Sequence, residues 1–219
     1  MGLTIHWEIE FEGSEGELIK KLDKIYDRVV EYAPMENERV DFDRAECKRR
    51  SENRINDDWF WLWIQSNRLV RKENRLIEIL PECVYALSVW PMKGCEQANF
   101  SFGKFPDVKK WRSQSFCKTC YSENPVLAHV MVCQVLHLFE KEGFAVKVED
   151  EGDFYKPSGV YGQEDFEKLS YRFGSDKKML AALGGMLKDS MPRDWEISAS
   201  IFNDPNFEHL EAEGRKEMN

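Results

Sequence analysis

The chain has 219 residues, 42% of them hydrophobic and 32% charged, which indicates a globular protein and excludes an intrinsically disordered one. Its formal net charge of −9 opposes binding to a polyanion, so the composition argues against a nucleic-acid partner. No apolar run is long enough to cross a bilayer, and we therefore expect no membrane partner.

The N-terminal part of the chain predicts a strand followed by a helix. Apolar and polar residues alternate over 3–11, a pattern typical of a strand with one buried face. A glycine-containing turn then leads into an amphipathic helix, which Pro34 ends. The next segment, 37–58, is polar and contains one short predicted strand over 40–42.

Aromatic and aliphatic residues dominate the middle of the chain. The run Trp59–Ile64 is apolar on both faces, which predicts a central strand that is covered from two sides. A second run of this kind extends over 84–90. Shorter strands are predicted over 99–102 and 115–121.

The C-terminal part of the chain is mostly helical by pattern. A helix is predicted over 125–142, where proline begins it, glycine follows it, and apolar residues nearly all round indicate burial. A short strand over 146–148 leads to an acidic turn, and a second helical region, interrupted near Gly174, extends over 163–188. The charged tail, 206–219, is expected to fray.

Together these elements predict an α+β fold. Adjacent strands alternate with helices, which favours a mostly antiparallel mixed sheet packed with two or three helices in a single domain, residues 1–205. Six cysteines are spread along the chain without an export signal, so we expect them to be reduced thiols. We therefore predict a soluble, cytoplasmic protein.

One spacing of cysteines and histidine matches a small zinc-binding unit. Two cysteines separated by two residues are followed, twelve residues later, by a third cysteine and a histidine on successive helical turns. These four candidate zinc ligands are Cys117, Cys120, Cys133 and His137. His129 shares the helix face of the last two. The alternative is that the helix is simply buried, with free cysteines acting as small apolar residues and the histidines hydrogen-bonded in the core.

Two motifs resemble those of a family of hypothetical proteins. They are P-x-x-G-C-E-x-A-N-F over 91–100 and S-F-C-K-T over 115–119, and the likeness extends to most of the chain. The resemblance implies one structural unit and carries no activity. The family pattern has glutamine where this chain has Cys120, so the resemblance implies that a four-ligand zinc site is not a shared property.

The motif residues predict one site for an enzyme or a small-ligand-binding protein. We expect a pocket where the Gly94–Asn99 loop meets Cys117–Lys118 and the Asp150–Asp153 turn. The candidate catalytic or binding residues are Cys95, Glu96, Asn99, Cys117, Lys118, His6, Asp150 and Asp153. A cysteine nucleophile, Cys117 or Cys95, would need a base such as His6 or His129; inert thiols are the alternative.

Two other functions are left open by the sequence. Trp59, Trp61 and Trp63 share one strand face, which either forms a second core layer or binds a protein partner, with self-association as one version. The third function is a structural module stabilised by zinc.

Overall fold

The computed structural model describes most of the chain. The described residues are 3–32, 40–43, 68–72, 75–79, 81–92, 94–106, 108–120, 122, 124–190 and 200–218. The elements in chain order are β1 (Thr4–Phe11), α1 (Glu15–Tyr32), β2 (Val40–Asp43), β3 (Arg68–Lys72), β4 (Arg75–Ile79), β5 (Cys83–Val89), β6 (Ala98–Lys104), β7 (Trp111–Lys118), α3 (Pro125–Lys141), β8 (Ala145–Asp150), α4 (Gln163–Ser190), η1 (Ser200–Asn203) and α5 (Phe207–Glu217). The predicted α+β class is confirmed.

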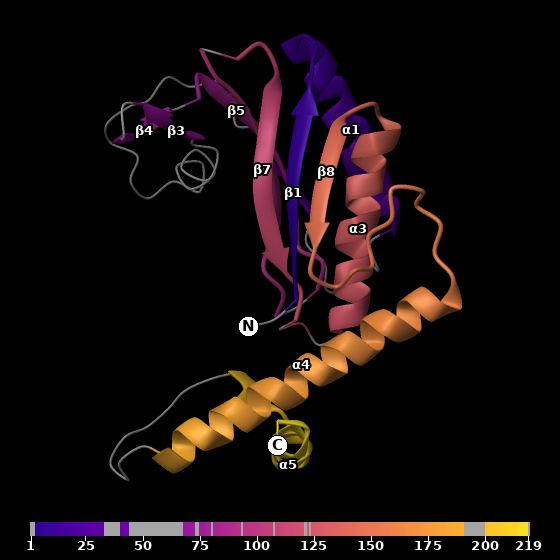
Figure 1. Cartoon of the computed structure of the whole chain (residues 1–219). Coiled ribbons are helices and arrows are strands. Elements are labelled where there is room, and N and C mark those ends of the chain that lie inside the picture. The colour runs from indigo at the N-terminus through magenta and orange to yellow at the C-terminus, as the bar shows by residue number, and fades with distance from the viewer. Residues whose placement is uncertain are drawn as a thin grey trace.

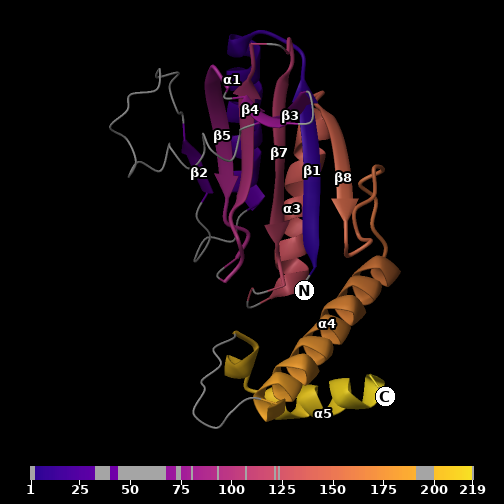
Figure 2. The same ribbon diagram turned by 60° about the vertical axis from the view of Figure 1, so that its left-hand side comes forward.

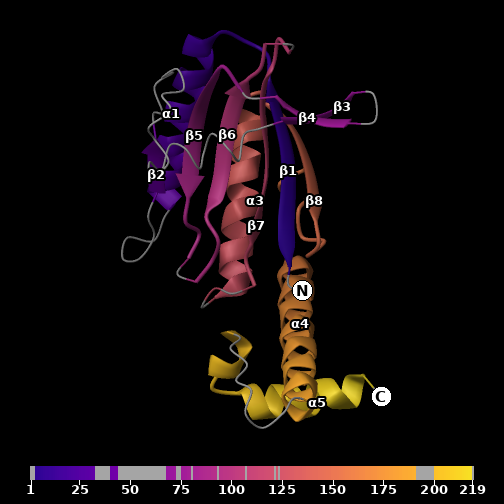
Figure 3. The same ribbon diagram turned by 90° about the vertical axis from the view of Figure 1, so that its left-hand side faces the viewer.

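One sheet with helices on one face forms the body of the molecule (Figure 1). Its six strands follow the order β2-β5-β6-β7-β1-β8, and every neighbouring pair is antiparallel. Helices α1 and α3 contact each other and cover the same face of the sheet (Figure 3). Strands β3 and β4 form a separate hairpin.

The core lies between this sheet face and the two helices. On β1 the alternation predicted from the sequence is confirmed, because Ile5, Trp7 and Ile9 are buried while His6 is exposed. The apolar stripe of α1 packs against them, and a hydrogen-bonded pair, Ser14 and Glu17, caps the start of that helix. Most of α3 is buried, as its composition predicts.

Aromatic side chains fill the centre of this core. Phe139 of α3 lies with its ring centroid 5.0 Å from that of Phe100, 5.5 Å from Phe102 and 5.1 Å from Phe144. Trp7 stacks on Phe100 at 4.7 Å. Large rings in such tilted and stacked contacts contribute more burial per residue than any aliphatic side chain.

Helices α4 and α5 extend away from the sheet (Figure 2). Only one end of α4 approaches α3, and α5 packs across the other half of α4. Lys178 of α4 lies 2.9 Å from Glu213 and 3.1 Å from Glu217, and a Cβ at Gly214 would meet the Lys178 carbonyl oxygen at 2.1 Å. The segment that we expected to fray is therefore a helix, because ion pairs and a close backbone approach fix it to α4.

Some predictions fall on parts of the chain outside the described residues. The strand predicted over Trp59–Ile64 lies there, and with it the three tryptophans of the aromatic face. The shorter strands predicted over 40–42 and 99–102 lie within β2 and β6. The strand predicted over 115–121 overlaps β7 only as far as Lys118, and residue 121 lies outside the described residues. Within the described ranges, none of the helices combines the length and the apolar character that crossing a bilayer requires.

Candidate functional site

A row of polar side chains interrupts the apolar surface of α3. His129, Cys133, His137 and Glu140 follow one another at intervals of four, four and three residues, so they lie along one side of the helix. Their partners come from the end of β7, the end of β8 and the loop that follows β8. The row contains two separate clusters, one fully buried and one beside a surface hollow.

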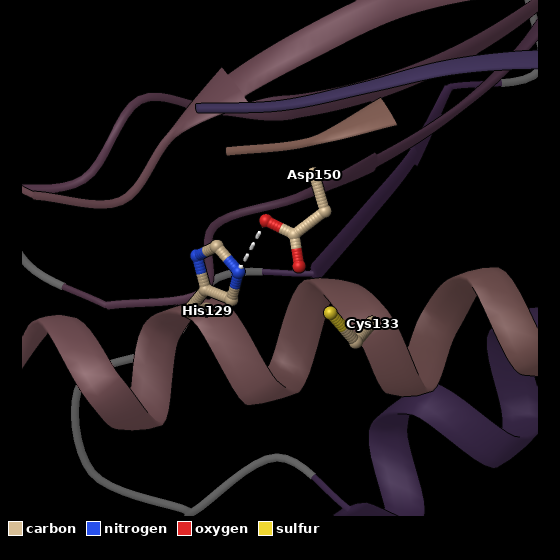
Figure 4. A group of neighbouring side chains, drawn as sticks. All are labelled: His129, Cys133 and Asp150. Carbon is tan, nitrogen blue, oxygen red and sulfur yellow. Dashed lines mark ion pairs between the residues drawn. The ribbon is translucent and has the colours of Figure 1, made fainter. Parts of the chain in front are cut away.

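The buried cluster consists of His129, Cys133 and Asp150 (Figure 4). Nε2 of His129 lies 2.9 Å from Oδ1 of Asp150, and one ligand atom from each of the three side chains lies within 4.8 Å of the other two. Asp150 pairs with Ile5 in the sheet, so both side chains project toward the helices. The side chains of His129 and Asp150 are 0% and 5% exposed.

Asp150 is held as a carboxylate by backbone donors. Oδ1 accepts a hydrogen bond from the Gly152 N–H at 2.7 Å, and Oδ2 accepts from Phe154 and Tyr155 at 2.8 Å each. Burial by itself raises the pKa of Asp150, but His129 and these N–H groups outweigh it and lower the pKa below its usual value. Gly152 is required here, because a Cβ would meet His129 Nε2 at 2.9 Å.

Thr119, just after β7, orients the ring of His129. Its Oγ1 lies 2.9 Å from Nδ1, and the residue is fully buried. On the other side of the ring, Nε2 has no hydrogen bond of good geometry, although Oδ1 of Asp150 is close. In the tautomer whose Nδ1–H donates to Thr119, Nε2 directs its lone pair toward a carboxylate, and a cation bound by both atoms would stabilise them.

Cys133 completes the buried cluster from the next turn of α3. Burial, followed by the nearby charge of Asp150, raises the pKa of the thiol well above its usual value. A thiol in this state is a poor nucleophile. It becomes a thiolate when a metal ion displaces its proton, since metal ligation and deprotonation are linked.

The second cluster is centred on His137. Nδ1 lies 2.7 Å from a Glu140 carboxylate oxygen and Nε2 lies 2.6 Å from the Tyr161 hydroxyl, while Tyr155 stacks on the ring at 4.7 Å. A hollow of about 510 Å³ lies alongside. Because both ring nitrogens have partners, the cluster fastens the loop after β8 to α3.

The four predicted zinc ligands do not come together. Among the described residues, the one group of three or more potential metal ligands contains Cys133 but none of Cys117, Cys120 and His137. Cys117 contacts Cys95 instead, and His137 is engaged by Glu140 and Tyr161. The spacing was compatible with a zinc unit, but β7 carries Cys117 and α3 turns His137 toward other partners.

The structure brings the two motif segments together. The Sγ atoms of Cys95 and Cys117 are 3.7 Å apart, and the Lys118 N–H donates to Glu96 Oε2 at 3.3 Å. Asn99 lies on the other face of β6, where its side chain accepts a hydrogen bond from Ser88 at 2.7 Å. Four of the predicted pocket residues therefore meet, and Asn99 is separate from them.

His6 lies on the opposite face of the sheet from this meeting point. It pairs with Phe116 and Glu149, whereas Cys117 and Asp150 pair with the neighbouring residue, Ile5. Since successive side chains of a strand point to opposite faces, His6 is not available as a base for Cys117. It lines a hollow of about 310 Å³ with Phe116 and Glu149 on that face.

Three further predicted roles are not supported by the surroundings. The hydrogen bond with Cys95, followed by burial, raises the pKa of Cys117 well above its usual value, which opposes a role as the first nucleophile while Cys95 is a free thiol. Asp153 lies at the surface, where it forms an ion pair with Arg172. His129, which we considered as a base for a cysteine, is instead a partner of Asp150. The sequence feature that could have indicated this partner is the acidic turn after β8.

Comparisons with known proteins give no match to this chain. No protein-family model, no curated protein and no solved structure matches the chain. What the buried cluster does therefore follows from its own donor atoms, distances and charges.

Proposed function

We propose that the protein is a metalloprotein in which His129, Cys133 and Asp150 bind one divalent transition-metal ion, with zinc as the first choice. The observation that carries this proposal is the grouping of three different ligand atoms within 4.8 Å in a buried place. Zinc binds nitrogen, sulfur and oxygen at about 2.0–2.3 Å, which sets tetrahedral ligand separations of about 3.3–3.8 Å. To reach those separations, Nε2 of His129 and Oδ1 of Asp150, now 2.9 Å apart, would have to move apart.

The donor set favours a borderline metal over a hard one. Calcium and magnesium prefer cages of oxygen atoms, whereas an imidazole nitrogen and a thiolate suit zinc and its neighbours in the transition series. Asp150 supplies one negative charge and Cys133 supplies a second once its thiol loses a proton. The two charges balance those of a divalent ion, which offsets the cost of burying it.

The metal would serve as a structural tie. Its ligands come from α3 and from the end of β8, and Thr119 adds the end of β7 through the ring of His129. A residue that hydrogen-bonds a ligand histidine without binding the ion itself fixes the orientation of that histidine. Three protein ligands leave the fourth tetrahedral position to a water molecule. The burial of His129 and Cys133 favours a structural role over one that requires contact with a substrate.

The test is the metal content of protein purified without added metal. We expect about one equivalent of zinc in the wild type and in the control variants Cys120→Ser and His137→Gln, and less than about a tenth of an equivalent in Cys133→Ser and His129→Gln. Circular dichroism would verify that each variant is folded. Folded wild-type protein that takes up no zinc from a buffered supply would contradict the proposal and leave a metal-free His129–Asp150 pair, with the ring of His129 hydrogen-bonded to Thr119.

A further inference from the structure

Two buried thiols, Cys95 and Cys117, lie in contact away from the metal-ligand cluster. We propose that they form a reversible dithiol–disulfide site that reacts with low-molecular-weight disulfides of the glutathione class. The proposal goes beyond the metal centre, since neither cysteine belongs to the three proposed ligands.

The backbone around the two cysteines already holds them in register. Their Sγ atoms are 3.7 Å apart. Sγ of Cys95 lies 3.3 Å from the Lys118 carbonyl oxygen, and Sγ of Cys117 lies 3.2 Å from the Glu96 carbonyl oxygen. The Glu96 N–H also donates to the Lys118 carbonyl oxygen at 3.4 Å. A disulfide bond is about 2.05 Å long, so the sulfurs must approach by only about 1.7 Å.

Cys95 is the more exposed residue of the pair. Cys95 is 8% exposed and lies between two exposed residues, Gly94 and Glu96, whereas Cys117 is 0% exposed. Gly94 has a φ of 81°, the left-handed conformation that glycine adopts without strain, and it allows the chain to turn at this point. An external disulfide therefore meets Cys95 first.

The exchange proceeds in two balanced steps. The Cys95 thiolate attacks one sulfur of oxidised glutathione, forms a mixed disulfide and releases one glutathione thiolate. The Cys117 thiolate then attacks the Cys95 sulfur and releases the second glutathione. The protein loses two electrons and two protons, and the oxidised glutathione gains both as two reduced thiols.

Formation of the mixed disulfide prepares Cys117 for the second step. The largest cause of its raised pKa is the hydrogen bond with Cys95, with burial second. Once Cys95 carries glutathione, it no longer acts as a neighbouring thiol, and this cause of the raised pKa is removed. Reaction at Cys95 therefore favours ionisation of the thiol that must resolve it.

Cys120 is the competing partner in the sequence. It stands three residues after Cys117, the spacing of a redox-active C-x-x-C motif, and it is half-buried. It lies in the turn after β7, whereas Cys95 has its sulfur against Cys117. The contact therefore assigns the disulfide to Cys95 and Cys117, and the assignment can be separated from the alternative by peptide mapping.

Trypsin divides the chain so that each outcome has its own signature. Cleavage after lysine and arginine yields one peptide over 94–104 with Cys95 and another over 113–118 with Cys117, while Cys120 and Cys133 fall in the peptide 119–141. Full-length protein would be treated with an excess of oxidised glutathione, alkylated and digested without reductant. Mass spectrometry would then identify any linked peptides.

We expect the peptides 94–104 and 113–118 to be linked, minus two hydrogens, and to separate after reduction. The link should persist in Cys120→Ser and disappear in Cys95→Ser, and the oxidised wild type should have a Tm higher by roughly 5–10 °C because it closes a chain loop. A link between 113–118 and 119–141 would overturn the proposal. Recovery of alkylated Cys95 at every ratio of oxidised to reduced glutathione would overturn it as well, and the wild-type result needs no variant to fold.

Discussion

The two halves of α3 contact the sheet in different ways, although both are buried. Toward its C-terminal end, Phe139 packs among aromatic rings of β6 and of the segment after α3. Toward its N-terminal end, His129 and Cys133 face Asp150 of β8. Phe139, His129 and Cys133 are all 0% exposed.

This difference separates two kinds of stabilisation. The aromatic half gains free energy from each apolar surface removed from water, whatever the identity of the neighbour. The polar half gains only if every buried donor and acceptor has a partner, and a single missing partner costs free energy. Changes in the aromatic half should therefore lower stability alone, while changes in the polar half should alter stability, pH dependence and metal binding together.

The largest loss of stability is expected in the aromatic half. Phe139→Ala removes a ring from contact with three others and should lower the free energy of unfolding by about 3–5 kcal/mol. Phe139→Leu fills more of the space than Phe139→Ala does and should lower the free energy of unfolding by less. Urea unfolding would measure both, and zinc content should stay at one equivalent in each. A loss of zinc in folded Phe139→Leu would contradict the separation of the two halves.

In the polar half, Asp150→Asn should have the largest effect on stability. The amide replaces one acceptor oxygen by a donor facing backbone N–H groups, at a cost of about 2–4 kcal/mol near neutral pH, measured on chelator-treated protein. The folded-state pKa of Asp150 is lowered, so its stabilisation is fully present above the unfolded-state value near 4. The difference from wild type should hold from pH 7 to 5 and shrink as pH falls below about 4.

Asp153 provides the matched control for that prediction. It is three residues away and forms an ion pair with Arg172, but its side chain is 73% exposed. Asp153→Asn should change the free energy of unfolding by no more than about 0.5 kcal/mol. An equal loss in the free energy of unfolding for Asp150→Asn and Asp153→Asn would mean that burial does not distinguish these two carboxylates.

A smaller effect is expected at Thr119, which touches the ring of His129. Thr119→Val keeps the shape of the side chain but removes the hydroxyl that contacts Nδ1 of His129. It should lower the free energy of unfolding by about 1–2 kcal/mol and weaken zinc binding about 10–100-fold. Thr119→Ser retains the hydroxyl and should bind zinc nearly as the wild type does. Competition with a chromophoric chelator gives both affinities, and equal affinity for Val and Ser would show that the hydroxyl does not position the ring.

The last prediction concerns the pH dependence of zinc affinity. Because burial keeps the Cys133 thiol protonated at neutral pH, zinc must displace one proton from it. The affinity should therefore rise about tenfold for each unit increase in pH, or about 1.4 kcal/mol. Cys133→Ser should lose this slope, and an affinity that is flat between pH 6 and 8 in the wild type would exclude the thiol as a ligand.

Much of the fold could be predicted because its signals are local. The alternation in β1 and the apolar surface of α3 each follow from a repeat of two or about four residues. Helix α5 could not be predicted in this way. Its residues are charged, and it depends on ion pairs with Lys178, which is more than 30 residues earlier in the chain.

The candidate site was only partly predictable for the same reason. The positions of His129 and Cys133 on one face of a helix follow from their spacing of four residues. Their partner depends on the register that pairs Asp150 with Ile5 across β8 and β1, and no local pattern fixes that pairing. The meeting of Cys95 and Cys117 likewise needed the fold, although both belong to the motif segments singled out in the sequence.

The most direct test of the metal centre is the absorption spectrum of the protein loaded with cobalt(II) in place of zinc. A cobalt ion bound by Cys133 should give a thiolate-to-metal charge-transfer band in the near ultraviolet and visible bands of tetrahedral intensity, at one equivalent of cobalt. Cys133→Ser should abolish the charge-transfer band, and Cys120→Ser should retain it. A folded wild-type protein with the spectrum of free aqueous cobalt, or a charge-transfer band that survives in Cys133→Ser, would contradict the account.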